Sequence, residues 1–376
     1  MVEKAGPVDT GAARVGFIPE LHALRGALAF WVFAAHLLGD AEGTLALRVL
    51  GAGGLAVDGF IMLSGFVIAM TLRDGKVSYR AFITRRVFRL FPVLAVCVVL
   101  ALVVHALAGP RLVREFPDTP LRILLVLGMV QGMVPDALLS CAARSVLGPA
   151  WSISLEWQFY LIAPALIGFM GAGAGSAHGG RPIALGRTMI VAAGTLAGAW
   201  VSFRMLSFCG TSSFLPMRLG YFLVGILSAQ AWLALRGAGA ETLHLVFAGL
   251  VALIFAFIPS MQLLTLLPWV AVLYASLAER DPLARPLQAL LHTSPIQQLG
   301  SISFSLYLVH MPVIHAVQVL ADATTLPPFW RAGLMVVLAV VITLVAAAGI
   351  WKWVELPCIA LGRRVAALGR PVAHPA

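Results

Sequence analysis

The chain has 376 residues, of which 60% are hydrophobic and only 11% are charged, whereas soluble domains carry roughly 25% charged residues. A chain of this length cannot bury that much apolar surface within itself, so lipid must cover it, and a soluble globular domain is excluded. The alternating segments of about ten residues that are typical of a membrane β-barrel are not seen. The net charge of +10 does not indicate nucleic-acid binding, because the basic residues stand in short segments between apolar runs.

Ten runs of about 20 mostly apolar residues follow one another, and each is long enough to span a bilayer as a helix. The sequence therefore predicts an all-α, polytopic transmembrane helix bundle that forms a single domain over 1–376. The expected spans are 21–40, 52–72, 88–108, 151–170, 187–206, 216–235, 243–260, 262–280, 299–320 and 332–352.

The segment 121–139 is an eleventh candidate, although glycine, glutamine, proline and aspartate interrupt it. Basic residues cluster at 73–89 and in the tail 353–376, so both should face the cytoplasm. Two spans precede 73–89, which places the polar segment 1–20 inside as well and makes the number of spans even. The segment 121–139 is therefore predicted to be re-entrant or interfacial. Segment 1–20 does not resemble a cleavable signal peptide, so the first helix is expected to stay.

The four cysteines form no C-x-x-C pair and no metal-binding spacing, and we expect no metal. Cys97 and Cys358 are expected to be packing residues. Cys141 and Cys209 are both expected near the outer side, where they could form a disulfide or remain unpaired.

The first span carries two ionisable residues, Arg25 and His36. They are eleven positions apart, about three helical turns, so they share one face roughly 16 Å apart along the axis. Charged groups inside spans are costly and therefore point to function. Histidine can accept and return a proton near neutral pH, which makes His36 a candidate general base. The alternatives are a snorkelling arginine and a structural histidine bonded to a neighbouring helix.

The second span begins on the outer side with Asp58, which is expected level with His36. A carboxylate there could orient the imidazole. The alternative is an ordinary carboxylate at a helix start, favoured by the helix dipole. Further along the span, Ser64 and Gly65 permit close packing of helices.

The third span opens with Arg85, Arg86 and Arg89. Arg86 and Arg89 are three positions apart and face the same way. Guanidinium groups near a helix N-terminus make a good phosphate site. Simple anchoring of the span to the inner membrane surface is the alternative.

The fourth span starts with Trp151 and Ser152 and continues through Glu156 to Tyr160. Aromatic residues favour membrane interfaces in any protein. A carboxylate one turn into the helix is harder to explain by the interface alone. Aromatic rings beside carboxylate and hydroxyl groups also suit a sugar-like acceptor.

The ninth span carries Ser303, Tyr307 and His310, which lie near one face by their three- and four-residue spacing. The last span ends with Glu355-Leu-Pro357.

Taken together, these segments resemble the acyltransferase-3 family of integral membrane O-acyltransferases, with motifs in the expected order over most of the chain. The motifs are Leu24-Arg25-Gly26 with His36, Val57-Asp58 to Leu63-Ser64-Gly65-Phe66, Arg86-x-x-Arg89, Trp151-Ser152 with Glu156 to Tyr160, Arg218 with Phe222 and Gly225, Ser303 to His310, and Glu355-x-Pro357. Three positions depart from the family pattern. Trp157 replaces a second glutamate, Val309 replaces an aromatic residue, and Met311 replaces a tryptophan.

The resemblance implies about ten spans in a bacterial cytoplasmic membrane and transfer of an acyl group, usually acetyl, from acyl-CoA to a hydroxyl of a glycan or small molecule. It also implies that His36 is catalytic and that the arginines at 25, 86 and 89 are functional. We expect Asp58 or Glu156 to tune the imidazole. Donor binding is expected at Arg25, Arg85, Arg86, Arg89, Ser64, Tyr307 and His310, and acceptor binding at Trp151, Ser152 and Tyr160.

In this hypothesis the donor enters from the cytoplasm, and its pantetheine arm follows the first helix towards His36. The sequence leaves open whether transfer is direct or passes through an acyl-histidine. The main rival is a transporter or flippase for an anionic or glycan substrate, because buried charges also serve transport. A non-catalytic lipid or glycan receptor is a third reading.

Overall fold

The computed structural model describes residues 17–39, 45–75, 77–109, 119–144, 146–171, 185–207, 213–258 and 262–368. In these ranges every regular element is a helix and no strand occurs. Nine helices of this part of the chain are long and apolar enough to cross a bilayer, and α10 is a shorter apolar helix. The predicted all-α polytopic bundle is therefore confirmed.

Each of the ten predicted spans coincides with one helix. The helices are α1 (Pro19–Leu38), α2 (Leu45–Gly51), α3 (Gly53–Leu72), α4 (Tyr79–Ala108), α5 (Pro120–Leu127), α6 (Ala150–Met170), α7 (Leu185–Met205), α8 (Leu215–Leu235), α9 (Ala240–Phe257), α10 (Leu263–Leu277), α11 (Arg285–Leu291), α12 (Ser294–Asp322), α13 (Pro328–Ile350) and α14 (Leu356–Leu368).

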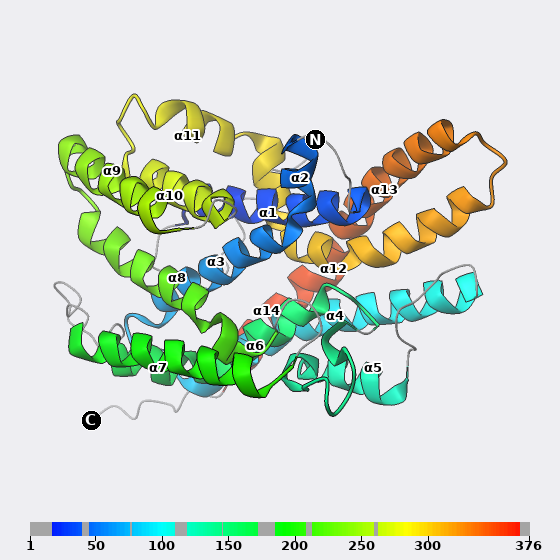
Figure 1. Ribbon diagram of the computed structural model, residues 1–376, viewed down its shortest axis with the longest axis horizontal. Helices are drawn as coiled ribbons and strands as arrows, with labels where there is room; N and C mark the ends of the chain where they lie inside the picture. The colour runs from blue at the N-terminus through cyan, green and yellow to red at the C-terminus, as the bar shows by residue number, and fades with distance from the viewer. Residues whose placement is uncertain are drawn as a thin grey trace.

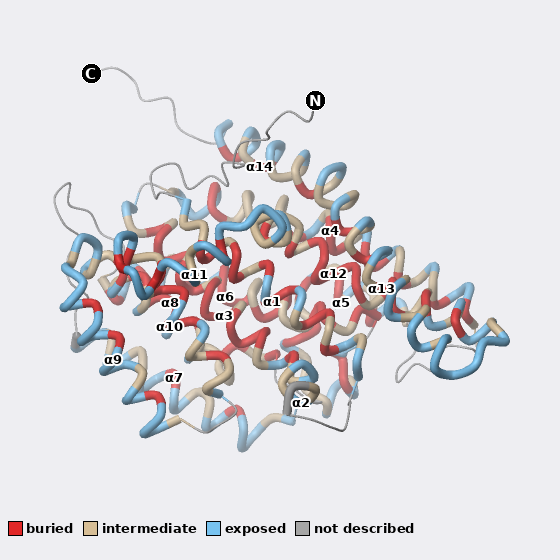
Figure 2. Tube along the Cα trace, turned by 90° about the horizontal axis from the view of Figure 1, so that it is seen from above, coloured by how far each residue is buried: buried red, intermediate tan, exposed pale blue. Residues whose placement is uncertain are grey.

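The middle of the bundle is formed by α1, α3 and α12, whereas α7, α9 and α13 lie at its periphery (Figures 1 and 2). Large apolar side chains are exposed along the peripheral helices, for example Leu196, Leu245 and Val345. In water such surfaces would be strongly unfavourable, so these helices present the face that lipid covers.

Glycine allows the central helices to approach closely in pairs. A Cβ on Gly26 of α1 would lie 2.5 Å from the backbone nitrogen of Gly300 on α12. A Cβ on Gly65 of α3 would lie 2.2 Å from a carbonyl oxygen of α8, and one on Gly225 of α8 would lie 1.9 Å from a carbonyl oxygen of α3. Small residues at such crossings are the usual means by which membrane helices pack without a side chain between them.

The segment 121–139 does not cross the membrane as a helix. It holds α5, whose eight residues rise only about 12 Å, followed by a short 3-10 turn and further turns. Its irregular backbone is bonded to α6, because Gln131 Nε2 donates to the Ala150 carbonyl at 2.8 Å and Gly132 N–H donates to Ser154 Oγ at 3.1 Å. Protein thus satisfies backbone groups that lipid could not, as predicted for a re-entrant or interfacial segment.

Beside this segment, Cys141 is disulfide-bonded. Cys209, the partner considered for it, lies outside the described residues. Cys97 and Cys358 are free thiols.

Two helices are longer than a bilayer requires. The 30 residues of α4 rise about 45 Å, and the continuous helix Pro328–Leu368, which joins α13 to α14, rises about 60 Å. A hydrocarbon core is about 30 Å thick, so both extend beyond it. A π-helical turn, Trp351–Glu355, separates α13 from α14, and α14 packs along α4 (Figure 1).

Candidate active site

A cavity in the middle of the bundle, here called the central cavity, is enclosed by α1, α3, α4, α6, α8 and α12. It holds about 750 Å³ of space free of protein atoms, its open end included, which is within the usual range for ligand pockets. Along α3 its lining extends from Ile68 to Val57, a rise of about 16 Å. The polar residues that line it are Arg25, Ser64, Arg86, Arg89, Ser152, Glu156, Tyr160, Ser303 and Tyr307.

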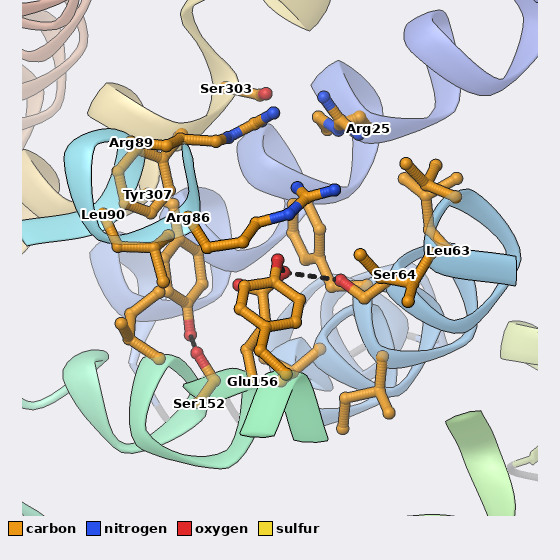
Figure 3. A pocket seen from close by; sticks show the side chains of 18 of the residues that line it. Arg25, Leu63, Ser64, Arg86, Arg89, Leu90, Ser152, Glu156, Ser303 and Tyr307 are labelled. Carbon is orange, nitrogen blue, oxygen red and sulfur yellow. Dashed lines mark hydrogen bonds between the residues drawn. The ribbon is translucent and has the colours of Figure 1, made fainter. Parts of the chain in front are cut away.

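Glu156 is the acidic residue among those that line the central cavity. Its Oε1 accepts a hydrogen bond from Ser64 Oγ at 2.7 Å, drawn in Figure 3, and another from the hydroxyl of Tyr160 one turn along α6. Spacing of four residues places Glu156 and Tyr160 on the same helical face. The carboxylate is therefore held in one orientation, between α3 and α6, and it faces the arginines.

The guanidinium groups of Arg25, Arg86 and Arg89 gather on the opposite side of the central cavity from the backbone of α6 (Figure 3). Arg86 lies over the rings of Phe82 and Tyr160, with its Cζ 5.4 and 5.0 Å from their centroids. Stacking on two aromatic faces fixes the planar guanidinium without neutralising it.

A second cavity, here called the basic cavity, adjoins the first, and the two share these three arginines. Arg85 from α4 and Arg363 from α14 line the basic cavity alone. Within the described part of the chain, Arg85 Nε and Arg363 Nη2 are buried and have no hydrogen-bond partner. A buried guanidinium N–H without an acceptor is costly, so these groups suit an anionic ligand.

At the other end of the central cavity two hydroxyl groups meet. Ser152 Oγ and the hydroxyl of Tyr307 are 2.7 Å apart, and Tyr307 also donates to the Pro149 carbonyl at 3.1 Å. Figure 3 shows the pair at the far side of the cavity from Arg25. Both residues were predicted from the sequence, one for acceptor and one for donor binding.

His36 lies in the last turn of α1, is exposed, and is not among the residues that line either cavity. Its Nδ1 is 2.9 Å from the Val32 carbonyl and 3.3 Å from Nε2 of His310, which is fully buried. The ring of His310 in turn lies 6.0 Å from that of Tyr307, centroid to centroid. His36 is thus joined to the end of the central cavity through two side chains of α12.

The packing of α1 against α3 shows how far His36 lies from the central cavity along the helix axes. A Cβ on Gly53 would lie 2.8 Å from the Cβ of Ala35, so the start of α3 is level with His36. Val57, which lines the end of the central cavity nearer His36, lies about one helical turn further along α3.

Asp58 bonds to Arg218 and not to His36, so the first of the two interpretations that the sequence left open for this carboxylate is wrong. The buried Asp58 forms an ion pair with the partly exposed Arg218 of α8, whose Cζ also lies 5.7 Å from the ring centroid of Tyr221. Glu156 is likewise bonded to hydroxyl groups and not to the imidazole. Within the described residues, the side chain that contacts the His36 imidazole is that of His310, where a carboxylate was expected.

Most of the predicted donor residues are brought together. Arg25, Ser64, Arg86, Arg89 and Tyr307 line the central cavity, and Arg85 lines the basic cavity, whereas His310 lies behind Tyr307. Of the predicted acceptor residues, Ser152 and Tyr160 line the central cavity and Trp151 is half-buried outside it. No group of three or more His, Cys, Asp or Glu side chains in the described residues is placed to hold a metal ion.

Sequence reasoning missed Arg363 and the bond from Ser305 Oγ to the buried carboxylate of Glu355 at 2.7 Å, and it placed Ser303 on one face with Tyr307 and His310 without assigning it to a binding site. Arg363 was read only as a basic residue that orients the tail. Its spacing carries no signal of a site, because the fold alone brings α14 to α4.

Comparison with known proteins identifies similar acyltransferases. The acyltransferase domain family matches residues 18–348 of the chain. The chain is 28% identical over 397 residues to acyltransferase MdmB of Streptomyces mycarofaciens, an alignment that covers 96% of this chain and 95% of that protein. No solved structure matches.

Proposed function

Because the chain belongs to the acyltransferase-3 family, we propose that it transfers an acyl group, acetyl in the simplest case, from acyl-CoA to a hydroxyl of a glycan-like acceptor. The observation that carries the proposal is a pair of adjoining cavities that share three arginines. The basic cavity holds two guanidinium nitrogens without an acceptor, on Arg85 and Arg363, and the central cavity extends to Ser152 and Tyr307.

The charge and the lining of the two cavities support acyl-CoA as the donor. The phosphates of acyl-CoA require cations, and guanidinium groups bind phosphate through paired hydrogen bonds. Arg25, Arg86 and Arg89 stand where the two cavities meet, so phosphates placed there would leave the central cavity for the uncharged pantetheine arm and the thioester. The predominantly apolar lining contributed by α3 suits that arm.

Transfer itself requires a base for the acceptor hydroxyl. In the proposed step His36 Nε2 takes the hydroxyl proton, the oxygen attacks the thioester carbonyl, the carbon–sulfur bond breaks, and CoA leaves as a thiol after the proton returns. Ser152 and Tyr307 could donate hydrogen bonds to the carbonyl oxygen as charge develops on it. The thioester must pass Tyr307 to reach His36, so the proposed step includes a movement of that side chain.

The acceptor would approach from the exposed side of His36, and the half-buried Trp151 at the start of α6 would suit a sugar-like face. A small hydroxylated molecule would satisfy the same chemistry. The orientation that fits is a cytoplasmic-membrane protein with Arg85 and Arg363 at the cytoplasmic side and His36 towards the outside, because acyl-CoA is made in the cytoplasm and basic residues favour that side. Both termini would then be cytoplasmic.

The proposal is tested with inside-out membrane vesicles from the native host that carry the wild-type protein or the His36→Ala variant. Radiolabelled acetyl-CoA is supplied at the cytoplasmic face, and label in the glycan and small-molecule fractions is measured. We expect incorporation with the wild type and a loss of about 100-fold or more with the variant, since general-base catalysis contributes 10²–10⁴-fold. Full incorporation by a folded His36→Ala variant would remove the histidine from the mechanism, and solute uptake without thioester consumption would favour the transporter.

A further inference from the structure

The basic cavity is not balanced by any acidic residue among those described as lining it. Its charged residues are Arg25, Arg85, Arg86, Arg89 and Arg363. Glu156 faces Arg25, Arg86 and Arg89, but it lines only the central cavity. The nearby carboxylates of Glu156 and Glu355 offset only part of the charge of Arg25, Arg86 and Arg89. The five guanidinium groups still repel one another, and an anion in the cavity would relieve that repulsion.

Two of these arginines also lack hydrogen-bond acceptors. Arg85 Nε and Arg363 Nη2 are buried from solvent and bond to no atom of the described residues. They come from different helices, α4 and α14, and neither lines the central cavity. An acceptor for both groups would therefore lie in the part of the basic cavity that the central cavity does not share, here called its far end.

Packing of α14 on α4 brings Arg363 to that end. A Cβ on Gly362 would lie 2.5 Å from the Cβ of Phe88, so only glycine lets the two helices approach this closely. The π-helical turn Trp351–Glu355 precedes α14, and turns of this kind are frequent at functional sites. Because α4 and the helix Pro328–Leu368 both exceed the bilayer thickness, their shared end can extend into the polar region where a water-soluble nucleotide has access.

We propose that Arg363, together with Arg85, binds the phosphates at the nucleotide end of the acyl donor, so that the C-terminal helix α14 forms part of the donor site. This inference rests on the proposed function and extends it to a residue outside the matched range 18–348. Arg25, Arg86 and Arg89 face both cavities and serve the part of the donor nearer the thioester. Arg85 and Arg363 face only the basic cavity and bind the part of the donor that lies furthest from the thioester.

The chain supplies a matched control. Arg364 is the next residue of α14, is exposed, and lines neither cavity. Both arginines carry the same charge at the same end of the molecule, so a general effect of net charge would be equal for the two.

The experiment measures binding of CoA to the full chain in nanodiscs of zwitterionic lipid by isothermal titration calorimetry. We expect Arg363→Gln to raise the Kd about tenfold or more, as loss of a charge-assisted phosphate contact should. Arg364→Gln should leave the Kd unchanged, and Arg363→Lys should restore part of the affinity. In transfer assays Arg363→Gln should raise the KM for acetyl-CoA and leave the KM for S-acetylpantetheine, which has no phosphate, unchanged.

Three other binding results would contradict either the proposed donor or the proposed role of Arg363. If the wild type binds no CoA, the donor assignment of the proposed function fails. If it binds CoA and Arg363→Gln binds it equally well, only the present inference is overturned. If the variant loses binding of phosphatidylglycerol but keeps that of CoA, the anion of the basic cavity is a lipid headgroup, and the inference is again overturned.

Discussion

His310 Nε2 on α12 lies 3.3 Å from His36 Nδ1 on α1, and the backbone carbonyl beside each ring assigns the tautomers of the pair. A carbonyl can only accept, so the 2.9 Å contact of His36 Nδ1 with the Val32 carbonyl places a proton on Nδ1. His310 Nδ1 likewise donates to the Leu306 carbonyl at 3.3 Å, which leaves its Nε2 as an acceptor. The Nε2 of His36 then carries the free lone pair that a general base requires.

His310 is therefore expected to act as a positioning residue for His36. Replacing it with leucine removes the acceptor at nearly constant volume, and we expect kcat to fall about tenfold, the effect of roughly 1.4 kcal/mol for one hydrogen bond. The KM for acyl-CoA should not change, because His310 lines neither cavity. His310→Gln, whose side-chain oxygen can accept in place of Nε2, should recover much of the kcat. Equal losses in both variants would mean that His310 only packs the core.

The same contact illustrates what sequence could and could not predict. Spacing along one helix correctly placed Arg25 and His36 far apart on α1. The expected pairing of Asp58 with His36 failed, because the pairing depends on the rotation of α3 about its axis. That rotation turns Asp58 towards Arg218 of α8, and no periodicity within either segment encodes it.

The ion pair of Asp58 and Arg218 gives a second prediction. Arg218→Ala should lower the free energy of unfolding by about 3–5 kcal/mol, since it leaves the buried carboxylate of Asp58 without its cation, and Asp58→Ala should cost less because Arg218 is partly exposed. Asp58→Leu combined with Arg218→Met should recover most of that loss, because an apolar pair needs no partner. Thermal unfolding of the purified variants in detergent measures all three, and a double-mutant cycle gives the coupling between them. Unchanged stability with lost transfer activity would instead assign the pair to function.

Glu156 gives a third prediction, about the stability of the central cavity. Glu156→Ala leaves the hydroxyls of Ser64 and Tyr160 without their acceptor, and we expect a loss of about 1–3 kcal/mol in unfolding free energy. Glu156→Gln keeps an acceptor oxygen of the same reach and should cost less. Glu241→Ala, an exposed carboxylate in the first turn of α9, is the control and should stay within about 0.5 kcal/mol of wild type. A loss in the Gln variant as large as in the Ala variant would contradict the hydrogen-bond argument.

The bundle itself was more predictable than the site. Apolar length locates each span, because a bilayer imposes it, and the polar interruptions in 121–139 correctly indicated an irregular segment. The crossings of the helices were not predictable. A glycine in an apolar run, such as Gly225, reads the same whether it faces lipid or another backbone, and only the assembled bundle distinguishes the two.

Gly225 and Gly220 of α8 differ in what a side chain at each position would meet, and this difference can be tested by substitution. A Cβ on Gly225 would lie 1.9 Å from the Met62 carbonyl oxygen, and the backbone of α3 cannot move aside without opening the crossing. Gly225→Ala should therefore destabilise the protein by about 1–3 kcal/mol or more, as overpacking does. A Cβ on Gly220 meets nothing within 4 Å, so Gly220→Ala should leave stability unchanged or raise it by about 0.5–1 kcal/mol through its higher helix propensity. Thermal unfolding in detergent compares the two, and equal melting temperatures would show that α3 and α8 do not cross this closely.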